Sequence, residues 1–113
     1  MATKKKSSVE LTHFGRKSGK PFKLTVWFVD LDGDVWIGTR DTARNWVRNV
    51  QATGRAELDF GDGAVAYRGT VGTDAELERF NRAILSAHPV GARIINFMAR
   101  GKPPCCFRLV PEG

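Results

Sequence analysis

The sequence predicts a mainly β, α+β protein built around a small closed or partly closed antiparallel barrel. Short segments rich in β-branched and aromatic residues are joined by glycine-containing turns, which is typical of antiparallel hairpins. Two segments carry a convincing helical pattern, and nowhere do strands and helices alternate as they do in parallel nucleotide-binding sheets. Because the chain has 113 residues, these elements fit into one domain.

Three strands are predicted before the first helix. Residues 9–14 alternate roughly between polar and apolar side chains, as a half-buried strand does. Residues 22–31 are rich in strand-forming residues, and residues 34–39 return as their partner after Asp32-Gly33, a pair typical of tight hairpins. This hairpin is the clearest local pattern in the sequence.

The first helix is expected to be capped by Asp41 or Thr42, whose side chains can accept from free N–H groups of the first turn. Four apolar side chains recur at helical spacing on one face: Ala43, Trp46, Val47 and Val50. Gly54 is a natural end for this helix.

Strands and a second helix follow. A second hairpin is expected over residues 55–60 and 64–72, and a last strand over residues 105–110, between prolines. Within that last strand Cys105 and Cys106 are adjacent, so they are expected to point to opposite faces.

The second helix begins with Thr73 and Glu76, which match the capping-box pattern. Its expected apolar stripe consists of Leu77, Phe80, Ile84 and Leu85. Residues 90–99 are expected to add a further short helical segment.

The net charge of +6 is concentrated at the front of the chain. The first 23 residues contain seven bases and one acid, whereas the remaining 90 residues carry equal numbers of both signs. Residues 1–8, with Lys4, Lys5 and Lys6, are expected to form a flexible basic tail before a domain over residues 9–113. Such a local field suits an anionic partner: a phosphorylated cofactor, a nucleic acid or an acidic membrane surface.

The turn after the first strand is a candidate phosphate-binding segment. It brings together glycines, cations and a hydroxyl group in Gly15, Arg16, Lys17, Ser18, Gly19, Lys20 and Pro21. Backbone N–H groups in such a turn can form a concavity for anions, reinforced by the cations. The turn is not a P-loop, because the spacing is one residue short and no helix follows. A solvated basic hairpin remains the alternative interpretation.

A second group of cations starts at the end of the first hairpin. Arg40, Arg44 and Arg48 are spaced by four residues, and Trp46 and Asn49 lie on adjoining turns. Anion binding near a helix start and a solvent-facing arginine stripe are both compatible with this spacing.

Catalysis by the chain's own side chains is not expected, and no catalytic residue is assigned. No nucleophile lies in a recognisable motif with a base, and His13 and His88 lack partners for a metal site. Two adjacent cysteines cannot build a disulfide framework, so a cytoplasmic protein is expected. No apolar run approaches the ~20 residues needed to span a bilayer, so no membrane partner is expected. These absences favour a bound cofactor that carries the reactive chemistry, as in hydride transfer.

These residues resemble the deazaflavin-dependent nitroreductase family, which belongs to the split β-barrel flavin and deazaflavin oxidoreductases. The segments that carry the resemblance are Leu11-Thr12-x-x-Gly15-Arg16-Lys17-Ser18-Gly19-Lys20-Pro21, the strand to Trp27, Trp46-x-x-Asn49 and Leu109-x-Pro111. The resemblance implies a split antiparallel β-barrel of the FMN/F420-binding type. It also implies that the deazaflavin F420 is the cofactor and that hydride passes from reduced F420 to an electron-poor small molecule.

The resemblance further implies a set of cofactor-binding residues. Contacts to the cofactor's phosphate would come from Arg16, Lys17, Ser18, Gly19, Lys20 and Arg40. Thr39, Trp46 and Asn49 would flank the cofactor, and Thr25 and Trp27 would line the groove nearer the ring. We expect the ring itself to lie inside the barrel. The chain departs from the family at Phe22, where members usually carry an arginine, and it lacks their tyrosines around residues 94–98, which argues against nitro compounds as substrates.

Other functions remain open at this stage. The barrel could bind FMN, or a non-redox anionic metabolite, in place of F420. A nucleic-acid-binding barrel would use Lys4 to Lys6 and the Gly15 turn on phosphates, with Trp27 or Trp36 on bases. The zero net charge after residue 23 argues against that alternative, because no extended basic track is evident. A homodimer is expected because the core of so short a chain is small.

Overall fold

The structure is a computed structural model that describes residues 8–112. The elements are β1 (Ser8–Phe14), β2 (Pro21–Leu31), β3 (Asp34–Thr39), α1 (Asn45–Thr53), β4 (Arg55–Asp59), β5 (Ala64–Val71), α2 (Asp74–Ala87), α3 (Pro89–Met98) and β6 (Cys105–Pro111). The tail expected over residues 1–8 lies outside the described residues except for Ser8, which begins β1.

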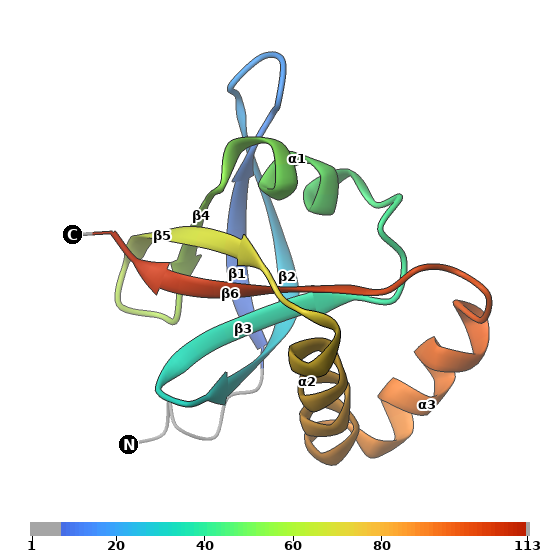
Figure 1. The fold of residues 1–113 in the computed structure, drawn as a ribbon. Helices are drawn as coiled ribbons and strands as arrows, with labels where there is room; N and C mark the ends of the chain where they lie inside the picture. The colour runs from blue at the N-terminus through green and yellow to red at the C-terminus, as the bar shows by residue number, and fades with distance from the viewer. Residues whose placement is uncertain (1–7, 113) are drawn as a thin grey trace.

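The described strands close into a barrel in the order β1-β2-β3-β6-β5-β4, with every neighbouring pair antiparallel. Figure 1 shows α1 across one end of this barrel and α2 and α3 together beside it. The predicted α+β class with an antiparallel barrel is confirmed. Both hairpins and the last strand lie within a residue or two of their predicted positions.

Side chains fill the interior of the barrel. Phe107, Leu11, Ile37, Leu58 and Leu109 are among its fully buried members, and Trp46 and Val50 of α1 close one end. A packed interior of this kind leaves no room for a cofactor. The expectation that a tricyclic ring lies inside the barrel is therefore wrong.

A second, smaller apolar cluster lies between the outer face of the barrel and α2. It contains Val29, Trp36, Phe80 and Cys106, whereas Cys105 belongs to the barrel interior. The adjacent cysteines thus point to opposite faces, as expected for a strand. Burial raises the pKa of both thiols, that of Cys106 to about 11.

The start of α1 differs from the prediction. The helix begins at Asn45, and its N-cap is Arg44, whose side chain makes no capping hydrogen bond. Asp41 does not cap the helix, because its carboxylate accepts from the backbone N–H of Ala43 and so closes a local turn instead. Thr42 and Ala43 consequently precede the helix. Gly54 ends it as predicted, at φ 68°, in the left-handed region that favours glycine.

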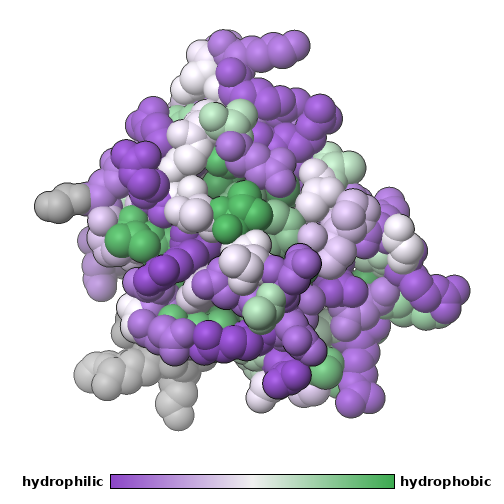
Figure 2. All heavy atoms as spheres, viewed as in Figure 1, coloured by the Kyte–Doolittle hydropathy of each residue, from purple (hydrophilic) through white to green (hydrophobic). Residues whose placement is uncertain are grey.

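The helices α2 and α3 form a separate wall outside the barrel. α2 begins with the predicted capping box, in which Thr73 and Glu76 each accept a hydrogen bond from the other's backbone N–H. Phe80 of α2 is buried against the barrel, whereas Leu85 is only partly buried. The face of the molecule shown in Figure 2 is largely hydrophilic, with hydrophobic side chains in separate small areas.

Candidate functional site

A cleft of about 260 Å³ lies between the barrel and the two outer helices. One wall comes from β2, the end of β3 and the start of α1, and the other from α2 and α3. The wall on the barrel side includes Leu24, Thr25, Val26, Trp27, Gly38, Thr39, Arg40, Asp41, Arg44 and Trp46. Five of the predicted site residues thus meet in this cleft: Thr25, Trp27, Thr39, Arg40 and Trp46.

The opposite wall was not foreseen from the sequence. It consists of Phe80, Asn81, Ile84, Ala92, Ile95, Asn96 and Ala99. A periodicity argument assigns such apolar helical positions to a core, and only contacts between distant segments show that they face a cleft. The sequence contained one sign of this wall. Ala92 and Ala99 are small and lie seven residues apart, which puts them on the same side of the short helical segment expected over residues 90–99.

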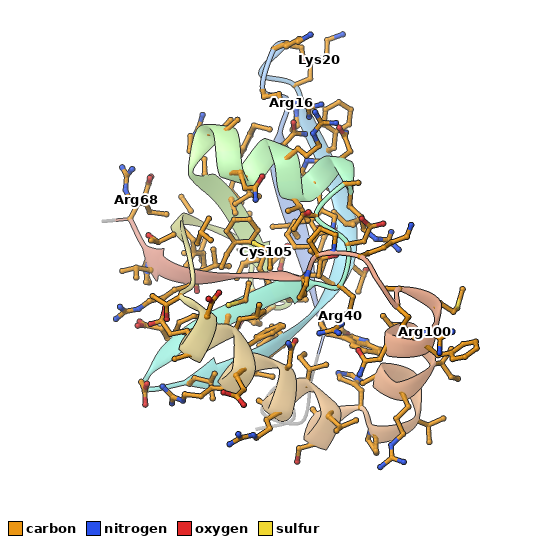
Figure 3. The ribbon with its side chains drawn as sticks, turned by 45° about the vertical axis from the view of Figure 1, so that its right-hand side comes forward. Arg16, Lys20, Arg40, Arg68, Arg100 and Cys105 are labelled. Carbon is orange, nitrogen blue, oxygen red and sulfur yellow. The ribbon has the colours of Figure 1, made fainter. Side chains whose placement is uncertain are left out.

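Arg40 is the most informative residue of the cleft. Its Nε is buried, and no residue of the described part of the chain accepts a hydrogen bond from it. Figure 3 places Arg40 between the barrel and the helical wall. A buried guanidinium N–H without an acceptor costs free energy, so it is expected to be satisfied by an acceptor that binds in the cleft.

A second hollow, more open to solvent, continues the cleft toward β1. It is lined by His13, Phe22, Leu24, Arg44, Asn45 and Trp46. Leu24, Arg44 and Trp46 line both cavities. A ligand longer than the main cleft can therefore extend along Arg44 toward the turn that joins β1 to β2.

Arg16 lies at the outer end of this path. Its Nη1 donates to Asn45 Oδ1 at 3.0 Å and to Asn49 Oδ1 at 2.7 Å, and its backbone N–H also donates to Asn49 Oδ1. Asn49 is fully buried and lines neither cavity. Asn49 therefore holds Arg16 in this structure, and its predicted role at the flank of a cofactor stays a prediction.

The rest of the predicted phosphate-binding turn points elsewhere. Lys17, Ser18, Gly19 and Lys20 are exposed and line neither cavity. Figure 3 shows Lys20 at the tip of the β1–β2 hairpin, at the opposite end of the molecule from Arg100.

Most of the backbone N–H groups of this turn already donate hydrogen bonds within the protein. The N–H groups of Gly15 and Gly19 donate to carbonyl groups of the same turn, and that of Lys20 donates to Ser18 Oγ. With the N–H of Arg16 bound to Asn49 as well, the turn offers fewer free donors to an anion than the sequence suggested.

Trp27 supports the corner between the two outer helices. Its ring is stacked on His88 with centroids 3.8 Å apart and planes 7° apart. Gly91 lies so close that a Cβ there would meet Trp27 Cη2 at 2.9 Å. The side chain of Trp27 therefore sets how closely α3 approaches the barrel.

The cleft carries positive charge. Arg40 and Arg44 line it together with Asp41, and the Asp41 carboxylate lies 3.4 Å from Lys102 Nζ. The backbone N–H of Ala43 and, less strongly, Lys102 hold the pKa of Asp41 below its usual value. Since Asp41 is offset by Lys102, the two arginines leave the cleft suited to an anionic ligand.

Within residues 8–112, no group of three or more His, Cys, Asp or Glu side chains could hold a metal ion. None of the helices in that part of the chain is long and apolar enough to cross a membrane.

Comparisons with solved structures support the fold. A structure titled F420-H2 dependent reductase (FDR-A) superposes with a TM-score of 0.74 at 19% identity, covering 93% of this chain and 95% of that one. A structure titled domain-swapped dimer has a TM-score of 0.76 at 19% identity, covering 93% and 81%. The haem storage protein HutZ from Vibrio cholerae has a TM-score of 0.70 at 14% identity, covering 98% and 85%. At such identities these likenesses show a shared fold.

Comparison by sequence identifies the family. No curated protein matches the chain. The sequence profile described as F420H(2)-dependent quinone reductase matches residues 2–93, which is most of the chain. The expected kinship with deazaflavin oxidoreductases, and F420 as the cofactor, are thereby confirmed, although the family is described by quinone reduction and not by nitro reduction. The chain belongs to the F420H2-dependent quinone reductase family.

Proposed function

We propose that this chain binds F420 in the cleft between the barrel and α2–α3 and reduces a quinone there. The observation that carries this assignment is the unpaired, buried Nε of Arg40 in the wall of a positively charged cleft. This nitrogen lacks a hydrogen-bond acceptor, and an anionic cofactor offers many acceptor atoms. The residues of the cleft therefore fit the cofactor of the family.

The deazaflavin ring would lie in the main cleft. Trp27 and Thr25 would flank it from the barrel side, and Ile84, Ile95 and the other apolar side chains of the helices would flank it from the other side. Bound F420H2 supplies a hydride ion and a proton, which together convert a quinone to its hydroquinone. Apolar walls keep water away from the reacting atoms and so strengthen the polar contacts made within the cleft.

The phosphate-bearing tail would follow the path from the cleft to the β1–β2 turn. Arg40 and Arg44 line its first part, and Arg16 stands at its outer end. Beyond Arg16, Lys17, Ser18, Gly19 and Lys20 would meet the end of the tail. Because these last residues are exposed and line neither cavity, they would act through charge that salt screens.

The protein's own contribution is positioning. Thr39 lines the cleft, but its hydroxyl is engaged with the backbone of Asp41. Asp41, the acidic residue of the cleft wall, is held ionised beside Lys102. Neither is free to exchange a proton with a substrate, so no catalytic acid or base is assigned.

The proposal is tested by mixing the protein with F420H2 and a soluble benzoquinone without oxygen and following oxidation of the deazaflavin. We expect the protein to raise the rate above that of the protein-free mixture with F420H2, and to leave the rates with reduced FMN or NADPH at their protein-free values. Turnover with reduced FMN alone would favour the FMN alternative. Absence of turnover together with absence of F420 binding would overturn the assignment.

We further propose that the chain forms a homodimer. The support is the similar structure whose title calls it a domain-swapped dimer, together with the small core expected of a chain of this length. Light scattering coupled to size-exclusion chromatography measures the mass directly. A single species of 12.5 kDa would contradict the dimer. The cytoplasmic location expected from the cysteines stays a prediction.

A further inference from the structure

The helix α3 turns most of its bulky apolar side chains away from the protein. Val90, Ile94, Phe97 and Met98 are 71%, 55%, 68% and 74% exposed. Their spacing of four, three and one residues puts them on one face of the helix. We call these four side chains the outer face of α3.

The inner face of the same helix carries mostly smaller or polar side chains. Ala92, Ile95, Asn96 and the C-cap residue Ala99 line the cleft, and Ala92 is the buried residue of α3. Ile95 is thus the one large apolar side chain of α3 in the cleft wall, whereas an ordinary surface helix points most of its large apolar residues inward. Figure 1 shows α3 at the edge of the molecule, standing away from the barrel. Four large exposed side chains on one short helix are typical of an interaction site rather than of scattered surface residues.

The charges around α3 are of one sign. Between Glu78 and Glu112 the sequence contains no acidic residue. The nearby cations Arg79, Arg82, Lys102 and Arg108 each pair with an acid elsewhere.

Arg93 and Arg100 have no acidic partner within the described residues. Arg93 lies four residues before Phe97, and the Arg100 guanidinium stands over the Phe97 ring, 5.2 Å from its centroid. The outer face is thus bordered by two cations whose charge no acid of the described chain offsets.

We propose that the outer face of α3 docks on the surface of an anionic lipid bilayer. The four apolar side chains would enter the boundary between headgroups and acyl chains, and Arg93 and Arg100 would meet lipid phosphates. A helix with an apolar face bordered by cations is the usual device for binding in this plane without crossing the bilayer. Cations beside such a face strengthen its binding to an anionic surface.

The charge pattern favours lipid over a second copy of the chain. A two-fold contact through α3 would bring the same residues of both copies together. Arg93 and Arg100 of one copy would then approach those of the other, with no acid on this segment to separate them. An anionic bilayer satisfies both the apolar face and the cations. Because the opposite face of α3 lines the cleft, docking would also bring the cleft close to lipid.

The test is co-sedimentation of the full chain with vesicles. One set is phosphatidylcholine alone, and the other is an equal mixture of phosphatidylcholine and phosphatidylglycerol. The key variant is the double substitution Phe97→Ser with Met98→Ser. Its matched control is Val71→Ser with Val110→Ser, which changes two exposed apolar residues of the barrel. Circular dichroism verifies that each variant is folded.

We expect the wild-type chain and the control to sediment with the anionic vesicles and much less with neutral ones. The α3 double variant should bind the anionic vesicles about tenfold more weakly, because two large side chains no longer enter the apolar layer. Arg93→Glu with Arg100→Glu should remove the preference for anionic lipid.

Two results would overturn the proposal. Equal sedimentation of the wild-type chain and the α3 double variant would assign the lipid contact to another part of the chain. The second result has two parts: the wild-type chain does not bind vesicles, and it is a dimer whereas the α3 double variant is a monomer. That result would identify the outer face as a contact between copies.

Discussion

Asn49 holds Arg16 across 33 residues of sequence, since its Oδ1 accepts from both the backbone N–H and the guanidinium Nη1 of Arg16. The Nδ2 of the same carboxamide lies 2.9 Å from His13 Nδ1. One buried side chain on α1 thereby fixes the β1–β2 turn that stands at the outer end of the proposed cofactor path.

Replacing this carboxamide should loosen the turn and destabilise the protein. Asn49→Ala leaves His13 and the Arg16 backbone without their partner, so we expect a loss of about 2–3 kcal/mol in the free energy of unfolding. Urea denaturation measures it. The matched control is Asn45→Ala, which removes an exposed contact of the same arginine and should cost less than about 0.5 kcal/mol. Equal losses in both variants would contradict the role of Asn49.

The same contact predicts a pH dependence of stability. Because Asn49 Oδ1 accepts from Arg16, its Nδ2 donates to His13, whose Nδ1 must then carry no proton. Burial lowers the pKa of His13 below its usual 6.5. As the pH falls below 6.5, the unfolded chain takes up a proton before the folded chain does. Stability should therefore fall, by at most about 1.4 kcal/mol per pH unit, until the pH reaches the lowered pKa of the folded state.

Urea midpoints of the wild-type chain and of His13→Gln test this dependence. Glutamine retains an acceptor for Asn49 Nδ2 but does not titrate. We expect a shallower loss of stability in the variant over the range just below pH 6.5. Identical slopes in the two proteins would show that His13 does not titrate differently on folding.

Gly91→Ala should push α3 away from the barrel. The added Cβ would lie 2.9 Å from Trp27 Cη2 and 3.2 Å from Cζ2, in a ring already stacked on His88. We expect a loss of about 1–3 kcal/mol in stability, a shift in tryptophan fluorescence and weaker F420 binding. Arg93→Ala, an exposed change on the same helix, should leave all three unchanged. Unaltered fluorescence in Gly91→Ala would mean that the helix yields without disturbing Trp27.

Lys17→Gln tests the contribution of the exposed turn. Since this side chain lines neither cavity, it should act through long-range charge. We expect F420 affinity to fall about two- to fivefold at low ionic strength and the difference to vanish at high salt. Arg68→Gln removes an exposed cation that pairs with Glu112 and should have no effect. A loss that persists at high salt would instead indicate a direct contact.

Local patterns were enough to predict much of the fold. The hairpin at Asp32-Gly33 and the capping box of Thr73 and Glu76 depend on neighbouring residues, and both were correct. The predicted start of α1 was wrong because the Asp41 carboxylate can either cap a helix or close a local turn. In the structure it accepts from the backbone N–H of Ala43 and closes the turn, and the helix begins later, at Asn45.

The site was only half predictable. Trp27 and Arg40 of the barrel wall were foreseen, because a resemblance in sequence maps them onto known positions. The α2–α3 wall depends on contacts such as Gly91 against Trp27, between segments far apart in the chain, which no local pattern encodes. Likewise, the engagement of the turn's N–H groups by Asn49 and by the turn itself is visible only in the folded chain.

The central claim is that the unpaired Arg40 in the cleft binds F420. Fluorescence titration of F420 with the wild-type chain, Arg40→Met and Arg48→Met tests it most directly, since Arg48 is an exposed arginine that lines neither cavity. We predict that Arg40→Met weakens binding about tenfold or more, through loss of charge-assisted hydrogen bonds, while Arg48→Met binds as the wild type does. Equal affinities of the two variants would contradict the account.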